Sequence, residues 1–241
     1  MLSILKKFGA KFSINGRRIE GSCSRFTAQI IDIMNYSERS DILTGPLVSG
    51  ATKTAILASL FVTEGMTTIL NPYQKPDVIF LVDFIKSYGF RTTLSKDAIT
   101  IMPPDYYISS PAPFRLCADV SQIMTYIALS VYHKIQVVME NVDWAIDSIG
   151  LKHELTILNS MGITLCGDGG QLTVSSPMQL RKQHIIVTSE SIYSDHQPLF
   201  AIMLTHANGV SKIEEHVWKK RFAYVSELNR LGFKMHEKIM N

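Results

Sequence analysis

A glycine-centred turn recurs along this sequence at a nearly constant interval. The three copies lie at Gly89, Gly162 and Gly232, so the spacings between them are 73 and 70 residues. Glycine readily adopts the left-handed backbone conformation that ends a helix and lets the chain turn back into a strand. One such turn marks only a helix end, whereas three at a constant period predict a repeated supersecondary unit.

The same succession of patterns precedes each glycine. Apolar residues at intervals of three and four predict an amphipathic helix directly before the glycine, and a more continuously apolar run upstream predicts a largely buried helix. β-Branched stretches between the two helices predict strands. The expected amphipathic helices are residues 77–86, 145–159 and 222–229, the buried helices 53–61, 121–132 and 197–205, and the strands 67–70, 136–139 and 210–213. Each unit is therefore expected to run strand, helix, strand, helix, strand, strand.

This order predicts an α/β protein in which helices pack on sheets. Proline-rich joins near residues 103–113 and 175–177 punctuate the units. We expect an N-terminal fragment that resembles the end of a preceding unit over residues 1–41, and repeat units over residues 42–110, 111–177 and 178–241. Because a single unit cannot bury both of its faces alone, the three units are expected to share one core.

The composition allows a sizeable core and narrows the classes of partner. The chain has 241 residues, of which 46% are hydrophobic, and a net charge of only +3. The basic cluster Lys219–Arg221 follows closely on Glu214 and Glu215, which argues against a nucleic-acid partner. No run reaches the roughly 18 apolar residues of a membrane span and no signal peptide is evident, so a cytoplasmic location is expected. The cysteines show no CxxC spacing, and neither a metal site nor a cofactor is expected.

Three segments match known motifs in order: residues 194–200 (SDHQPLF), 207–209 (ANG) and 220–232 (KRFAYVSELNRLG). They resemble the T-D-x-Q-[AP] turn, the A-x-G step and the N-R-F-x-[HY]-x-x-E-L-x-R-[ML]-G helix of the enolpyruvyl transferases, in particular of the branch that acts on UDP-N-acetylglucosamine. Residues 48–52 (VSGAT) and 63–71 (TEGMTTILN) resemble its S-V-G-A-T and A-E-G-T-T-x-I-x-N. Residues 114–119 (FRLCAD) resemble Y-R-V-x-x-D-R more weakly, since Val120 replaces the arginine.

The resemblance implies a fold and a reaction. The fold is an inside-out α/β barrel of repeated βαβαββ units, with three units and an N-terminal fragment present here of the six in the full family enzyme. The reaction transfers the enolpyruvyl group of phosphoenolpyruvate to a hydroxyl of a UDP-sugar or related nucleotide. Since this sequence matches only part of the family, a homo-oligomer or a companion chain is expected to complete the cleft.

An alternative stays open, because key catalytic residues of the family are not matched. These are its N-terminal Lys–Asn pair, a mobile loop that carries Cys and Arg, and two C-terminal arginines. The alternative is a non-catalytic family member that acts as a nucleotide-sugar-binding, regulatory or scaffold protein.

Two candidate catalytic residues follow from the resemblance. Asp195 corresponds to the family's usual candidate for the base that accepts the proton of the reacting sugar hydroxyl. Its alternative role is to cap, with Ser194, the helix expected near Gln197. Arg221 resembles a family arginine whose guanidinium could hold phosphate or carboxylate. The alternative for Arg221 is an ion pair with a nearby acid, namely Glu214, Glu215 or Glu227.

The candidate substrate-binding residues are Ser49, Gly50 and Thr52. They precede an expected helix, and free backbone N–H groups at a helix N-terminus suit a phosphate or diphosphate. The family resemblance implies contact with the uridine diphosphate here, and the alternative is an ordinary strand-to-helix turn. His196, next to Asp195, has no identifiable partner in the sequence, and a surface position is expected for it.

Overall fold

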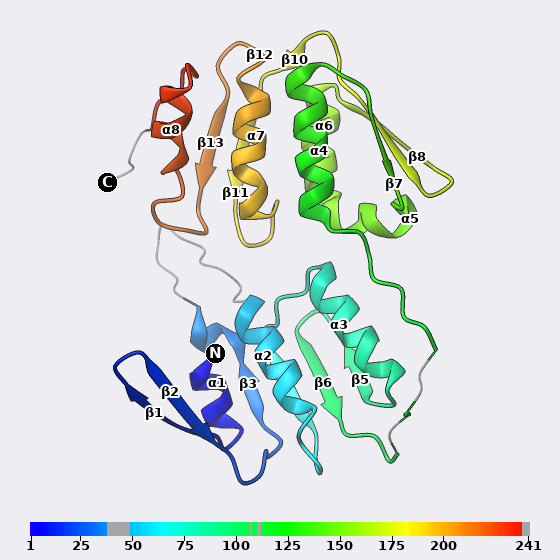
Figure 1. Ribbon diagram of the computed structural model, residues 1–241, viewed down its shortest axis with the longest axis vertical. Coiled ribbons are helices and arrows are strands. Elements are labelled where there is room, and N and C mark those ends of the chain that lie inside the picture. The colour runs from blue at the N-terminus through cyan, green and yellow to red at the C-terminus, as the bar shows by residue number, and fades with distance from the viewer. Residues whose placement is uncertain (38–48, 107, 110–111, 238–241) are drawn as a thin grey trace. The chain divides into compact units, whose positions relative to one another are not determined.

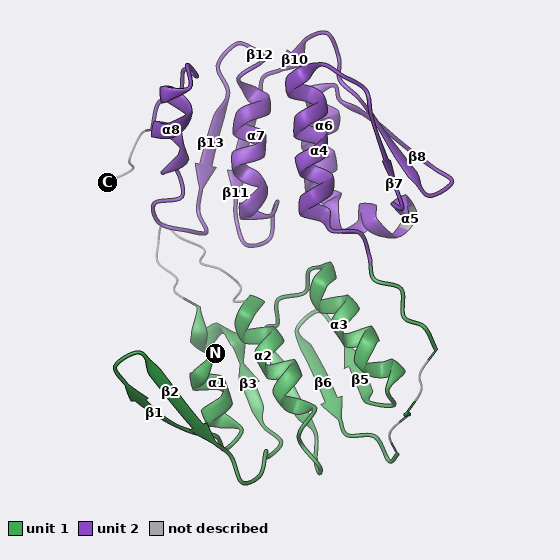
Figure 2. Ribbon diagram, viewed as in Figure 1, with its two compact units in different colours: residues 1–38, 46–116 green, residues 39–45, 117–241 purple. Residues whose placement is uncertain are grey.

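The computed structural model describes residues 1–37, 49–106, 108–109 and 112–237. The described residues up to Leu116 form one compact unit, unit 1, and those from Cys117 onward form a second, unit 2 (Figure 2). The unit boundaries expected at 41/42 and 110/111, and Val48 of the VSGAT segment, lie outside the described residues.

Unit 1 contains a four-stranded mixed sheet of order β3-β4-β6-β5 (Figure 1). β3 runs parallel to β4, and β6 is antiparallel to both of its neighbours. The elements are α1 Leu2–Lys7, β1 Lys11–Asn15, β2 Arg18–Ser22, β3 Ile30–Asp32, η1 Ile33–Tyr36, α2 Ser49–Ser59, β4 Thr67–Leu70, α3 Pro76–Ser87, β5 Arg91–Leu94 and β6 Ala98–Met102. β3 and η1 lie in the N-terminal fragment expected over residues 1–41, and the described elements of the unit expected over residues 42–110 follow in the order helix, strand, helix, strand, strand.

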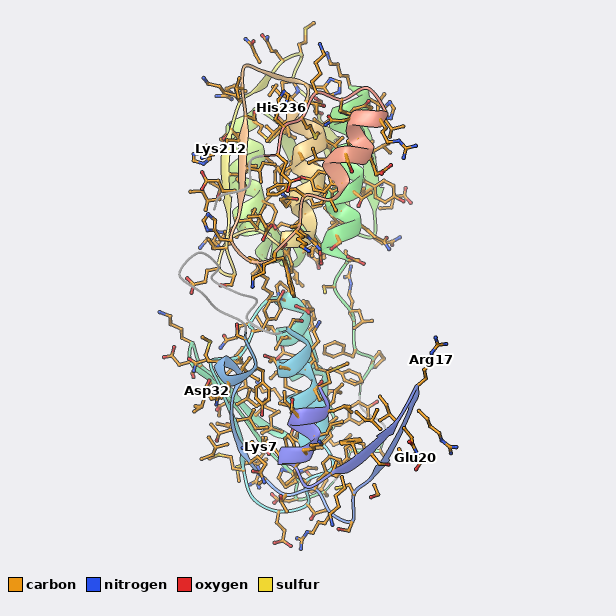
Figure 3. The ribbon with its side chains drawn as sticks, turned by 90° about the vertical axis from the view of Figure 1, so that its left-hand side faces the viewer. Lys7, Arg17, Glu20, Asp32, Lys212 and His236 are labelled. Carbon is orange, nitrogen blue, oxygen red and sulfur yellow. The ribbon has the colours of Figure 1, made fainter. Side chains whose placement is uncertain are left out.

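The core of unit 1 forms where α1, α2 and α3 meet this sheet. In β6 every second residue, Ile99 and Ile101, is buried, so one face of the strand meets the helices. The largest fully buried side chains of unit 1 are Ile4, Phe8, Ile33, Ile56, Ile69, Ile99 and Ile101. By contrast β1 and β2 pair only with each other and are mostly exposed. Figure 3 shows the labelled residues of this hairpin, Arg17 and Glu20, pointing away from the core.

Unit 2 contains one antiparallel sheet and two short parallel pairs. The sheet has the order β7-β9-β8, while β10 pairs with β12 and β11 with β13. The elements are α4 Val120–His133, β7 Val137–Glu140, α5 Trp144–Asp147, η2 Ser148–Leu151, α6 Lys152–Met161, β8 Thr164–Asp168, β9 Gln171–Ser175, β10 Leu180–Arg181, β11 His184–Val187, η3 Ser194–His196, α7 Gln197–Leu204, β12 Ala207–Asn208, β13 Lys212–Glu215 and α8 Tyr224–Arg230.

Two apolar helices, α4 and α7, pack against each other in the middle of unit 2 (Figure 1). α4 begins where the Asp119 carboxylate accepts the backbone N–H of Ser121 at 2.8 Å and of Gln122 at 3.3 Å, which are groups that a helix start leaves unpaired. The buried residues shared by the helices and sheets include Met124, Ile127, Leu151, Leu158, Leu172, Val187, Phe200 and Met203. Unit 2 thus has its own core.

The turn glycines behave as the sequence predicts. Gly89 and Gly162 have φ values of +94° and +95° and join α3 to β5 and α6 to β8. Gly232, at +96°, follows α8, although no strand comes after it within the residues described up to 237. Gly9, at +108°, occupies the same place between α1 and β1. A residue with a Cβ is strained in this conformation, which explains why glycine recurs at these helix ends.

Other expectations differ from the structure. The helix predicted over residues 145–159 is broken into α5, η2 and α6. No strand forms among residues 112–119, so the second expected unit lacks its opening strand there. The buried residues form one cluster in each compact unit, and the sharing of a single core by all three repeats stays a prediction. The inside-out barrel and the three-unit division stay predictions. No helix in the described part of the chain is both long and apolar enough to cross a membrane.

The burial of Phe200 in the core of unit 2 can be tested by substitution. Phe200→Ala removes a ring that is 0% exposed, so it should lower the free energy of unfolding by about 3–5 kcal/mol. Phe61→Ala removes a ring that is 68% exposed and should change it by less than about 1 kcal/mol. Denaturant unfolding followed by circular dichroism measures both changes. Equal effects would contradict the assignment of Phe200 to the core.

A charged cluster on β11 and β13 generates a prediction about pH. Hydrogen bonds from Lys212, His184 and His216 lower the pKa of Glu214 from 4.5 to about 2; Lys212 lies on β13 and is labelled in Figure 3. Because the folded state holds the ionised carboxylate, the stability that Glu214 contributes is present above pH 4.5 and is lost as the pH falls toward 2. The stability difference between the wild type and Glu214→Gln should therefore shrink below about pH 4.5. Denaturant unfolding at pH 6, 4 and 3 measures it, and a constant difference would refute the prediction.

Candidate functional site

The candidate site in unit 2 is built around Asp195 and Arg221. Asp195 lies in η3, the short helical turn that leads into α7, and Arg221 lies in the turn between β13 and α8. Arg221 Nη2 donates a hydrogen bond to Asp195 Oδ1 across 26 residues of sequence. The Asp195 side chain is 78% exposed and that of Arg221 is 30% exposed. The fold thus brings both predicted catalytic residues together and leaves the carboxylate accessible.

The structure bears on the alternative roles that the sequence leaves open for these residues. The N-cap residues of η3 and α7 are Tyr193 and His196, and neither helix start has a side-chain cap, so Asp195 and Ser194 do not cap them. Arg221 pairs with Asp195 and with none of the three glutamates expected as alternatives in the described structure. Of these, Glu214 pairs with Lys212, and Glu227 with Arg230 at 2.8 Å. Arg221 Nε is buried and has no hydrogen-bond partner among the described residues.

Glu215 and Tyr224 complete the surroundings of Arg221. Burial raises the pKa of Glu215. The hydrogen bonds that its carboxylate accepts from the Val217 and Trp218 N–H groups, and the charge of Arg221, act to lower this pKa. Burial also raises the pKa of Tyr224 to about 12. The Arg221 guanidinium therefore lies near a partly desolvated acid, as well as against the exposed one at Asp195, and its charge is balanced inside unit 2.

His196 is buried, which corrects the surface position expected from the sequence. Its ring is 0% exposed, and Nδ1 lies 2.8 Å from Oε1 of Glu154, which is 1% exposed. Nε2 lies 3.2 Å from the Ser121 hydroxyl at the start of α4. A buried imidazole needs partners for both nitrogens, and here two other helices supply them.

The order Ser121–His196–Glu154 matches that of a nucleophile, a base and an orienting acid. Such a relay also needs donors that stabilise an oxyanion. At the start of α4 the N–H groups of Ser121 and Gln122 are already bound to Asp119, and the His196 ring has no exposed surface. The arrangement therefore serves as a buried polar connection between α4, α6 and η3.

Glu154 and Ser121 were missed in the sequence, although one signal pointed to Glu154. It occupies a position on the apolar face of α6, three residues after Leu151 and four before Leu158, both of which are fully buried. A carboxylate at such a position is seldom buried without a partner. The partner could not be identified, because His196 is 42 residues away along the chain.

The predicted substrate-binding residues lie in unit 1, at the first turns of α2. Ser49 is partly exposed and Gly50 is exposed, with no atom within 4 Å of the position that a Cβ would take. Thr52 is 0% exposed, and its hydroxyl accepts the backbone N–H of Tyr73 at 3.0 Å. The Thr52 side chain thus serves the packing of unit 1, and the accessible groups at this helix start belong to Ser49 and Gly50. No cluster of three potential metal ligands occurs in the described residues.

Comparison with known proteins shows the family to which this chain belongs. A family model for EPSP synthase (3-phosphoshikimate 1-carboxyvinyltransferase) matches residues 4–240. The UDP-N-acetylglucosamine 1-carboxyvinyltransferase of Prosthecochloris aestuarii is 29% identical, over 97% of this chain and 52% of the relative. The protein of the same description from Aliarcobacter butzleri is 24% identical, over 98% of this chain and 53% of the relative. The chain spans about half the length of these relatives.

Solved structures of the same family are also similar to this chain. The enolpyruvyl transferase NikO from Streptomyces tendae is 26% identical with a TM-score of 0.82, over 95% of this chain and 53% of that one. An EPSP synthase from Acinetobacter baumannii, at 16% identity and a TM-score of 0.55 over 88% of this chain and 47% of that one, shares the fold. The α/β architecture with mixed sheets and the match over residues 4–240 together show that the chain belongs to the EPSP synthase (3-phosphoshikimate 1-carboxyvinyltransferase) family.

Proposed function

We propose that this chain contributes to enolpyruvyl transfer from phosphoenolpyruvate to a hydroxyl of a UDP-sugar or related nucleotide. The observation that carries the proposal is the contact between Asp195 and Arg221, the two residues expected to be catalytic. The relatives described as UDP-N-acetylglucosamine 1-carboxyvinyltransferases support the choice of acceptor. NikO, an enolpyruvyl transferase, supports the reaction class.

Asp195 is proposed as the general base. In enolpyruvyl transfer the acceptor oxygen adds to the double bond of phosphoenolpyruvate while the methylene carbon gains a proton. Phosphate then leaves as the new methyl group loses a proton, which restores the double bond. A carboxylate within hydrogen-bond reach of the acceptor hydroxyl can take up its proton. The exposed Asp195 carboxylate is available for this contact, and Arg221 keeps it oriented.

Arg221 is proposed to hold an anionic group of the substrates. Its guanidinium presents several donors in a fixed plane, which suits carboxylate and phosphate. Its contact with Asp195 uses Nη2, and Nε has no hydrogen-bond partner in the described residues. A bound phosphate or carboxylate would share the guanidinium with Asp195 and satisfy a donor that is otherwise unmatched.

The start of α2 is proposed to contact the nucleotide diphosphate. The positive end of the helix dipole and the unpaired N–H groups of a first helical turn both favour an anion. Ser49 and Gly50 are accessible there, and Gly50 offers no side chain that would hinder close approach to its backbone. Thr52 is not included in the proposed contact, because its hydroxyl is bound to the Tyr73 N–H.

A second copy or a companion chain is proposed to complete the active site. The relatives are about twice as long as the stretch that matches this chain. Enolpyruvyl transfer requires several cations around phosphoenolpyruvate, and Arg221 alone cannot neutralise both its phosphate and its carboxylate.

The second candidate function is a non-catalytic, nucleotide-sugar-binding or scaffold role. One observation favours it: the charges of Asp195 and Arg221 already pair with each other, so neither charge requires a substrate as its counterion. This candidate predicts binding of the nucleotide sugar with no product that depends on phosphoenolpyruvate, under any pairing of chains.

Calorimetric titration with UDP-N-acetylglucosamine, alone and with phosphoenolpyruvate, tests the proposed function. The wild type should bind, and Asp195→Asn should weaken binding in the presence of phosphoenolpyruvate by about tenfold, which is about 1.4 kcal/mol, because the charged partner of the hydroxyl is lost. Glu190→Gln, which removes an exposed carboxylate earlier in the same loop, is the control and should bind as the wild type does. A folded wild-type protein that gives no heat with either ligand would sink the proposal.

Substitution of Gly50 tests the proposed diphosphate contact. Gly50→Ala should fold at least as stably, since there is open space at this helical position and alanine is the better helix former by about 0.5–1 kcal/mol. Gly50→Leu should fold but bind UDP about tenfold or more weakly, because the larger side chain obstructs approach to the backbone N–H groups. Thermal unfolding and titration with UDP separate the two effects. Unchanged UDP affinity of a folded Gly50→Leu protein would exclude the contact at α2.

A further inference from the structure

Glu154 accepts hydrogen bonds from both sides of Asp195. Its Oε1 lies 2.7 Å from the backbone nitrogen of Tyr193, which donates its N–H, and 2.8 Å from Nδ1 of His196. Tyr193 immediately precedes η3, and His196 is its last residue. One carboxylate oxygen on α6 therefore ties down the turn just before and just after the residue proposed as the base.

Further contacts hold the same turn in the interior. The His196 N–H donates to the Tyr193 carbonyl at 2.9 Å, and the rings of Tyr193 and His196 lie 4.9 Å apart between centroids. The remaining nitrogen of His196 is bonded to the Ser121 hydroxyl of α4. The turn is thus connected to two helices that belong to the core of unit 2.

Asp195 itself has a different environment. Its side chain is 78% exposed, and its ion-pair partner, Arg221, lies in a turn and not in a helix or strand. The direction of an exposed carboxylate depends on the backbone that carries it, so what holds that backbone also sets the position of the carboxylate. A misplacement of about 1 Å in a reacting group can cost roughly 100-fold in rate.

We propose that Glu154 is a positioning residue that holds the Tyr193–His196 turn and thereby places Asp195, with His196 and Ser121 as the other members of the connection. The catalytic meaning of this placement rests on the proposed function, whereas the hold on the turn does not. Glu154 lies in the first turn of α6, where the helix dipole favours a carboxylate. Loss of its oxygen would leave two donors, the partly buried Tyr193 N–H and a nitrogen of the buried His196 ring, without this acceptor.

The test compares substitutions on α6 by hydrogen exchange of the Tyr193 amide. In Glu154→Ala this amide should exchange at least about tenfold faster than in the wild type, because its acceptor is gone. Glu154→Gln should retain most of the protection, since an amide oxygen can accept both hydrogen bonds. Leu158→Ala on the same helix removes a fully buried core side chain that cannot accept a hydrogen bond from the turn, and it controls for general loss of stability. Exchange is therefore compared with that of the Phe200 amide in the same sample.

Ligand binding provides the second measurement. Glu154→Ala should weaken binding of UDP-N-acetylglucosamine in the presence of phosphoenolpyruvate about as much as Asp195→Asn does, and Glu154→Gln should restore it. The proposal is overturned if Glu154→Ala protects the Tyr193 amide as well as Leu158→Ala does, or if Glu154→Gln fails as completely as Glu154→Ala. If the wild type binds neither ligand, the proposed function fails, while the exchange data still decide whether Glu154 holds the turn.

Discussion

The hydrogen bond between His196 and Glu154 is the interaction on which the candidate site depends most. Both side chains are almost fully buried, at 0% and 1% exposed, among buried residues that are mostly apolar. A polar group in such a place is tolerated only when it is paired, so each residue requires the other at close to its observed position. The pairing joins α6 to the start of α7, and Ser121 extends it to α4. The turn that carries Asp195 is consequently held by the interior of unit 2.

The Asp195–Arg221 pair has the opposite character, because it is partly open to solvent. Exposed ion pairs stabilise a fold by about 0–1 kcal/mol, so this contact contributes little to holding α8 and η3 together. Its significance is chemical: a carboxylate suited to accepting a proton lies against a guanidinium suited to holding an anion. Burial raises the pKa of Glu215, and the charge of Arg221 opposes this rise. The guanidinium therefore acts on two acids at once, Glu215 and Asp195.

Much of the secondary structure follows from local physics and could be predicted. Gly89, Gly162 and Gly232 were placed at helix ends because only glycine takes up a positive φ without strain, and all three have φ near +95°. α3 was found from the spacing of its apolar residues, and α4 and α7 from more continuously apolar runs. The broken helix at residues 144–161 was not predicted, since apolar spacing does not distinguish one continuous helix from α5, η2 and α6 in succession. Repetition likewise indicates similar units without indicating which of them pack together.

The sequence by itself determined the local turns, the alternation of helices and strands, and through its motifs the family and the identity of Asp195 and Arg221 as candidates. These depend on neighbouring residues or on short patterns, which a linear sequence displays directly. The tertiary structure alone decided that Arg221 contacts Asp195 and not a nearby glutamate. It also decided that the Thr52 hydroxyl accepts the Tyr73 N–H, and that His196 is buried against Glu154. Each of these contacts joins residues at least 21 positions apart, and such pairings are chosen by the packing of the whole unit.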